Sequence, residues 1–128
     1  MTKFKIELNK PSSTTGGLIY RKNHFLGFDV YDKIINNNLF IYFETISQYD
    51  TRCATVTNLR LDHNYDLIGE FVFMDNFNGK EFMSLYDMPC QFAIIPYGIA
   101  TINEYKEVGD DFEFYGFIVS DYVWSSHE

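Results

Sequence analysis

The order of apolar and polar residues along the chain predicts a protein built mainly from β-strands. Residues 2–9 alternate between apolar and polar side chains, which is the pattern of a strand with one buried face. Residues 39–48 and 52–61 are two further strand-like segments, and the polar residues between them predict a hairpin. Residues 92–102 are apolar on both faces, so we expect a central strand that is covered on both sides.

The segment 92–102 also carries signs of an irregular ladder. Pro96 has no N–H to donate to a neighbouring strand, and Gly98 follows two residues later, so we expect a bulge or a bend there. A polar turn around Asp110 separates this segment from another apolar run at 112–119. The whole region therefore predicts two strands joined by a polar turn.

The pair Asn78-Gly79 is the strongest turn signal in the chain. Both residues tolerate the positive φ that a type I′ turn requires. We therefore expect a two-residue hairpin between strands at 67–77 and 80–86.

Residues 29–37 are the best candidate for a helix. Asp29 is a suitable N-terminal cap, and a run of asparagines after the segment is a plausible stop. Two pairs of apolar residues with i,i+4 spacing would form one apolar face. The pairs are Val30 with Ile34 and Tyr31 with Ile35.

These elements predict an all-β or β-rich α+β protein. We expect a mainly antiparallel sandwich or small barrel of about eight strands, with the one short helix at 29–37. The length of 128 residues suits a single domain, 1–128. Residues 11–17, rich in Ser, Thr and Gly, predict a mobile loop, and residues 125–128 predict a frayed tail.

The charge is distributed unevenly along the chain. Residues 1–64 hold eight Lys and Arg against six Asp and Glu, a balance of +2, whereas residues 65–128 hold two against twelve, a balance of −10. The net charge of −8 predicts repulsion from nucleic acid and from anionic membranes. The expected partner is therefore a protein with a basic surface.

Candidate chemistry is sparse. The segment 62–66 matches the opening of a calcium loop, but Leu67 and Phe73 stand where Gly and a bidentate Glu are needed, so we expect no metal site. Glycine-rich phosphate-binding motifs are missing from the sequence, and we expect no cofactor and no catalytic residues. Cys53 and Cys90 without a secretory segment predict reduced thiols and a cytoplasmic protein.

The acidic half is also rich in tyrosine, a residue that is enriched at protein interfaces. The sequence therefore predicts a partner-binding surface in that half. Its expected residues are Glu104, Tyr105, Asp110, Asp111, Glu113, Tyr115 and Tyr122.

These observations favour a small acidic protein-binding module that is not an enzyme. A narrower version is an inhibitor from a phage or other mobile element that occludes a basic, nucleic-acid-binding surface of its partner. Two alternatives stay open: a virion or assembly protein that forms a homo-oligomer, and an aromatic-lined β-barrel that binds a small ligand.

Overall fold

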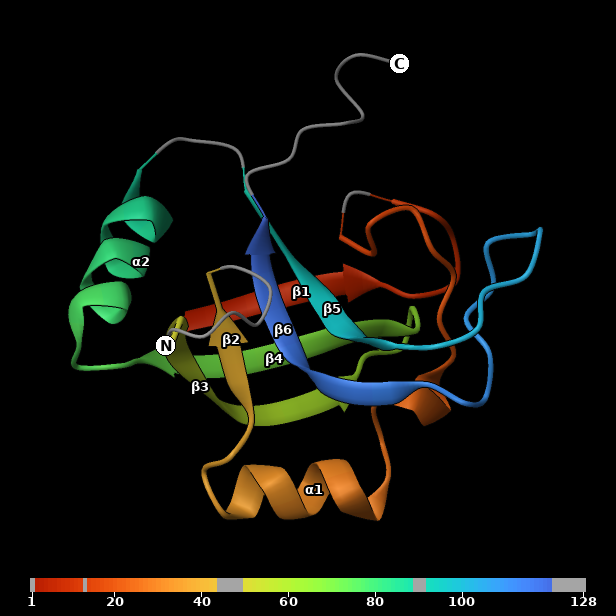
Figure 1. The fold of residues 1–128 in the computed structure, drawn as a ribbon, viewed down its shortest axis with the longest axis horizontal. Helices are drawn as coiled ribbons and strands as arrows, with labels where there is room; N and C mark the ends of the chain where they lie inside the picture. Colours follow the sequence, from red (N-terminus) through yellow and green to blue (C-terminus); the bar gives the residue numbers. More distant parts are fainter. Residues whose placement is uncertain (1, 13, 44–49, 89–91, 121–128) are drawn as a thin grey trace.

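The computed structural model describes residues 2–12, 14–43, 50–88 and 92–120, and over these residues the chain forms one curled sheet with two α-helices (Figure 1). The strands are β1 (Thr2–Glu7), β2 (Phe40–Tyr42), β3 (Arg52–Leu61), β4 (Asp66–Phe73), β5 (Ala93–Ile99) and β6 (Glu113–Ser120). The helices are α1 (Phe28–Ile35) and α2 (Phe77–Asp87), and a short 3-10 turn, η1 (Lys22–His24), precedes α1.

The six strands lie in the order β1-β4-β3-β2-β6-β5. Neighbours are antiparallel except β2 and β6, which run parallel. The prediction of a β-rich fold is confirmed, but the sandwich or closed barrel of about eight strands is wrong. The sheet is a mixed half-barrel: the parallel pairing of β2 with β6 makes it mixed, and the segment 80–86, which was expected to be a strand, belongs to α2. The outer strands β1 and β5 also approach each other without pairing over the described residues.

The core fills the concave side of this sheet and is built largely from phenylalanine. The expected alternation of the first strand is confirmed, since Phe4 and Ile6 are buried. The Phe4 ring meets Phe117 of β6 edge-on, with centroids 4.8 Å apart. A Cβ on Gly69 of β4 would lie 2.2 Å from the Phe4 ring, so this ring can cross β4 only over a glycine. Burial of each such ring stabilises the fold by roughly 1.5–3 kcal/mol.

The hairpin predicted at Asn78-Gly79 is wrong, because α2 begins there. The Asn76 side chain caps this helix and accepts a hydrogen bond from the Gly79 N–H at 2.6 Å. Gly79 is needed for close approach rather than for positive φ, since a Cβ there would lie 1.8 Å from the Met74 carbonyl oxygen.

Helical spacing explains why this segment is not a strand. Phe82 and Tyr86, four residues apart, lie on the same face of α2 and pack against Phe71 of β4. The Tyr86 hydroxyl also donates to the Lys3 carbonyl oxygen at 3.1 Å, which ties α2 to the free edge of β1.

The predicted helix at 29–37 is confirmed as α1, although its N-cap is Gly27 rather than Asp29. Val30 is buried, whereas Tyr31 and Ile35 are exposed. The predicted apolar face is therefore only partly buried, because the second pair is exposed.

The segment expected to be the central strand, β5, is instead an edge of the sheet and pairs only with β6 over the described residues. The expected bulge is confirmed by a register shift between Tyr97 and Gly98, where Tyr115 of β6 is the extra residue. The predicted hairpin of β2 and β3 is also confirmed, and the connecting residues 44–49 lie outside the described part.

The loop at 11–17 sits near the opening between β1 and β5. The Thr14 hydroxyl accepts from the Glu7 N–H of β1 at 3.1 Å, and Gly16 faces Ile95 of β5. Thr15 is buried and accepts from the Ser12 N–H at 3.0 Å. The mobility of this loop stays a prediction, and the tail expected to fray at 125–128 lies outside the described residues.

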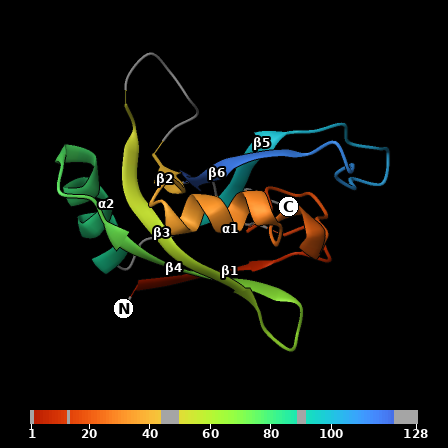
Figure 2. The same cartoon turned by 90° about the horizontal axis from the view of Figure 1, so that it is seen from below.

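The shortness of β2 shapes the surface of the molecule. β2 has only three residues, so the second half of β3 and the start of β6 extend beyond it without a strand between them. α1 lies across this split, with β3 on one side and β6 on the other (Figure 2). The Lys33 ammonium of α1 donates to the Phe114 carbonyl oxygen at 3.0 Å, beyond the point where β2 begins.

Candidate functional site

Two hollows flank α1, one along each side of the split in the sheet. The hollow between α1 and β3 has a volume of about 400 Å³ and apolar walls. The groove between α1 and the start of β6 has a volume of about 760 Å³ and mixed polar and apolar walls. Both share Gly27, Phe28 and Val30, so the two hollows meet at the N-terminal turn of α1.

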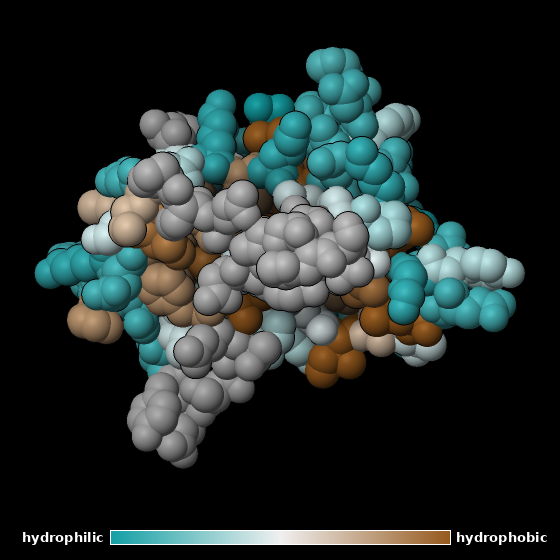
Figure 3. All heavy atoms as spheres, turned by 90° about the horizontal axis from the view of Figure 1, so that it is seen from above, coloured by the Kyte–Doolittle hydropathy of each residue, from teal (hydrophilic) through white to brown (hydrophobic). Residues whose placement is uncertain are grey.

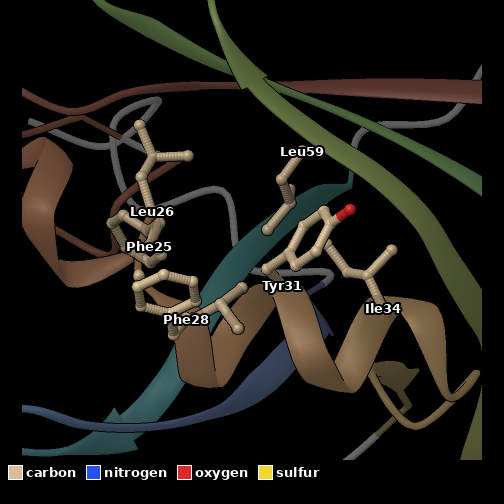
Figure 4. Close-up of a pocket in the computed structure, with 8 residues that line it drawn as sticks. Phe25, Leu26, Phe28, Tyr31, Ile34 and Leu59 are labelled. Carbon is tan, nitrogen blue, oxygen red and sulfur yellow. The ribbon is translucent and has the colours of Figure 1, made fainter.

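The apolar hollow arises from the run Phe25-Leu26-Gly27-Phe28, which joins η1 to α1. Phe25 is buried and packs edge-on against Phe114, with centroids 5.1 Å apart. This anchor leaves Leu26 and Phe28 on the outside, 43% and 92% exposed. Figure 4 shows the hollow between these side chains and Tyr31, Ile34 and Leu59.

The outer side of α1 carries several large apolar side chains, which is unusual for a helix facing solvent. Tyr31 is 62% exposed, and Ile35, one turn further on, is also exposed. Together with Leu26 and Phe28 these residues form what we call the α1 apolar stripe. Contiguous exposed apolar surface of this kind marks interaction sites in soluble proteins. On the opposite face of the molecule, the residues not drawn in grey show hydrophobic side chains in separate groups (Figure 3).

The groove on the other side of α1 is acidic. Its carboxylates are Asp29 and Asp32 on α1 and Asp110 and Glu113 on the opposite wall. Lys33 also lines the groove, but its ammonium is directed at the Phe114 carbonyl oxygen. Arg21 pairs with Asp110 at 3.2 Å, and both side chains are mostly exposed, so this ion pair stabilises little. The four carboxylates outnumber the two cations, Lys33 and Arg21, so the formal charge of the groove is negative.

His24 holds the acidic wall in place. Its Nδ1 accepts from the Arg21 backbone N–H at 3.0 Å, so Nε2 carries the proton and donates to the Gly109 carbonyl oxygen, also at 3.0 Å. Partial burial lowers the pKa of His24, and the nearby Arg21 charge lowers it further, against the opposing effects of the Gly109 carbonyl and Asp110. The neutral ring thus ties η1 to the turn that presents Asp110.

The structure brings together three of the seven residues predicted to bind a partner. Asp110, Glu113 and Tyr115 line the acidic groove, and the Tyr115 hydroxyl donates to the Glu113 carboxylate at 2.8 Å. This hydrogen bond raises the pKa of Tyr115. Glu104 and Tyr105 are exposed near the tip of the loop between β5 and β6 and do not line the groove.

The other two predicted residues have different positions. The Asp111 carboxylate closes the base of the β5–β6 loop by accepting from the Thr101 hydroxyl at 2.6 Å and from the Thr101 N–H at 3.1 Å. These hydrogen bonds lower the pKa of Asp111. Tyr122 lies outside the described residues.

Sequence reasoning missed the contribution of α1. Asp29 and Asp32 lie in the half of the chain whose balance is +2, so a sum over sequence halves hides them. A usable signal was nevertheless present, because residues 25–35 contain more apolar side chains than one buried face of a short helix can use.

A row of aromatic rings crosses the outer face of the sheet next to the acidic groove. Tyr115 contacts Tyr97 of β5 with centroids 5.6 Å apart, and Tyr97 contacts Tyr42 of β2 at 6.2 Å. Phe40 follows at 6.3 Å from Tyr42, and the Arg52 guanidinium lies 4.8 Å above the Phe40 ring. All four rings are partly buried, so the row extends the contact surface only modestly.

The remaining candidate chemistry has structural explanations. The buried Cys53 thiol donates to the Ile41 carbonyl oxygen at 3.3 Å, and burial raises its pKa to about 12, so it stays a thiol at neutral pH. The Asp62 carboxylate accepts from the N–H groups of Asn64 and Asp66 and shapes the β3–β4 turn. Within the described ranges, His, Cys, Asp and Glu side chains form no group of three or more that could hold a metal ion. Cys90 lies outside these ranges.

Comparisons of the chain with protein-family models, with curated proteins and with solved structures found no match. In the part of the chain that the structure describes, neither helix is long and apolar enough to cross a membrane. The site is therefore interpreted from its geometry and charge.

Proposed function

We propose that this chain is a non-enzymatic protein-binding module that contacts a basic surface of a partner protein through α1 and the acidic groove beside it. The observation that carries this proposal is the position of α1. The helix covers a split in the sheet and turns an apolar stripe outward, directly beside a groove with four carboxylates.

The combination suits a protein interface better than either part alone. Protein interfaces pair a central apolar region with a polar rim that sets specificity and association rate. Here the α1 apolar stripe supplies the centre, and Asp29, Asp32, Asp110 and Glu113 supply the rim. A cleft lined by charge of one sign also concentrates its field and attracts groups of the opposite sign.

A narrower form of the proposal is an inhibitor of phage or mobile-element origin. The groove carboxylates would then take the place of nucleic-acid phosphates in a basic cleft of the partner. The net charge of −8 supports this form, because a nucleic-acid-binding cleft attracts polyanions. Displacement of bound DNA or RNA from the partner by the intact chain is the measurement that checks it.

The two alternatives fit the fold less well. The ligand-binding barrel assumed a closed barrel, whereas the concave side of this half-barrel is filled by rings such as Phe4, Phe71 and Phe117. An assembly protein made of many copies would have to bring molecules of charge −8 together, which self-repulsion opposes.

The test uses the full chain and a partner captured from cells that naturally produce it. A variant that combines Asp29→Asn, Asp32→Asn and Glu113→Gln removes three charges but keeps each side-chain shape. We expect its association rate to fall by roughly tenfold at low salt, and the wild-type rate to fall steeply as salt rises. The matched control also removes three charges, at Asp75, Glu81 and Asp87, which lie on α2 or just before it. The proposal would be contradicted if the association rate changes neither with salt concentration nor in the groove variant.

A further inference from the structure

The outward side of α1 defines the shape of what it can bind. Phe28, Tyr31 and Ile35 are spaced i, i+3 and i+7, which places them in one line along the helix. The helix is eight residues, or about 12 Å, long. A straight apolar ridge of this kind packs beside another helix, whose side chains enter the hollows on either side of the ridge.

A second line on α1 carries charge. Asp29 and Asp32, spaced i and i+3, lie next to the apolar line and face the acidic groove. Lys33, the one basic residue of α1, donates to the Phe114 carbonyl oxygen and forms no ion pair with Asp29 or Asp32, so its single charge offsets these two carboxylates only in part. α1 therefore presents an apolar line and an acidic line side by side.

From this arrangement we infer that the element that docks on α1 is a short amphipathic helix of the partner, with one apolar stripe bordered by Lys or Arg. Its apolar side chains fill the hollow of about 400 Å³ between Phe28 and Leu59. Its basic side chains lie over the groove lined by Asp29, Asp32 and Glu113. This inference rests on the proposed function and adds the kind of partner element.

Other occupants fit the surface poorly. Strand addition would need a free ladder edge, but α1 already covers the diverging ends of β3 and β6. A second copy would bring like charges together, since each chain carries −8 and its α1 carries an acidic line. An anionic lipid surface would be repelled for the same reason.

The probes are three synthetic peptides of about 14 residues, ~21 Å long when helical. The first has leucines at i, i+3, i+4 and i+7 spacing with lysines elsewhere. The second has glutamate in place of lysine, and the third has the composition of the first in an order without a helical stripe. Binding to the intact chain is measured by fluorescence anisotropy. We expect the first peptide to bind, the third to bind at least tenfold more weakly, and the glutamate peptide not to bind.

Variants of the chain separate the apolar contribution from the charge contribution. Phe28→Ala and Tyr31→Ala should each weaken binding of the lysine peptide about tenfold or more, because each removes an exposed anchor. Phe77→Ala, on the distant α2 and also well exposed, is the matched control and should leave binding unchanged. Circular dichroism should show the lysine peptide gaining helix when the chain is added.

The outcomes distinguish the two levels of the proposal. In one outcome, the double variant Asp29→Asn with Asp32→Asn binds the lysine peptide more weakly, whereas Phe28→Ala and the order of residues in the peptide have no effect on binding. That result would overturn the helix inference but would still support the acidic surface. If the double variant also leaves peptide binding unchanged, the result would count against the helix inference and against the proposed function. A dimer in sedimentation that Phe28→Ala converts to a monomer would overturn the inference by showing that a second copy covers this face.

Discussion

The two helices of this protein use their apolar residues in opposite ways. α2 turns Phe82 and Tyr86 inward to a cluster of rings on β4, and the Asn76 side chain caps its first turn. Val30 is the one buried residue of α1, and no side chain caps the first turn of this helix. The comparison indicates that α2 serves the stability of the fold, whereas the outer face of α1 is available for binding.

Truncation of one ring on each helix should give the largest difference. Phe82 is fully buried against Phe71 and Phe73, so Phe82→Ala should lower the free energy of unfolding by about 3–5 kcal/mol. Phe28→Ala removes a side chain that is 92% exposed and should change this free energy by less than about 0.5 kcal/mol. Urea unfolding followed by far-ultraviolet circular dichroism measures both. Similar losses in the two variants would refute the division of roles.

Glycine-to-alanine replacements at the starts of the two helices should give a smaller difference. As a reference, replacing glycine by alanine in an exposed helix interior stabilises the helix by about 1 kcal/mol. Gly79→Ala should instead destabilise by roughly 1–3 kcal/mol, since its Cβ would lie 1.8 Å from the Met74 carbonyl oxygen. Gly27 has no heavy atom within 4 Å of its Cβ position, so Gly27→Ala should cost less than about 1 kcal/mol. A stabilising effect of Gly79→Ala in thermal unfolding would show that α2 does not pack closely against Met74.

These two helices also show what local sequence can and cannot predict. α1 was predictable because its i,i+4 pairs and polar ends favour a helix at short range. α2 was not, because Asn78-Gly79 has a strong local turn preference. Burial of Phe82, at roughly 1.5–3 kcal/mol, together with the partial burial of Tyr86, exceeds that preference only once β4 is in place.

Strand order and the site depended on contacts between distant parts of the chain. The apolar pattern of β5 correctly indicated a strand with a bulge, but not that parallel pairing of β2 with β6 would leave β5 at an edge. Charge counted along the chain indicated Asp110 and Glu113, yet the groove also needs Asp29 and Asp32 from the basic half. Folding places these four carboxylates around one groove, and a sum of charges along the sequence cannot reveal this arrangement.

The smallest expected effect is the pH dependence of folded stability that arises from His24, which supports one wall of the acidic groove. His24 joins η1 to the Gly109 carbonyl oxygen, and its pKa in the folded protein is lowered mainly by burial. The unfolded chain therefore takes up a proton first as pH falls below about 6.5, and folded stability should decrease over that range. Well above about pH 6.5 His24 is neutral in both states, and the full contribution of its hydrogen bond to folded stability is present.

Urea unfolding between about pH 5 and pH 8 isolates this effect, because carboxylates with lowered pKa values, such as Asp50 at about 2 and Asp111, lose their contribution only at lower pH. His24→Gln should flatten the decrease below about pH 6.5. His63→Gln, at an exposed position in the β3–β4 turn, should leave it unchanged. If the acidic wall depends on this tie, His24→Gln should also weaken binding of a basic partner while Phe77→Ala does not. A pH profile that His24→Gln leaves unaltered would assign the decrease to other groups and remove His24 from the support of the groove.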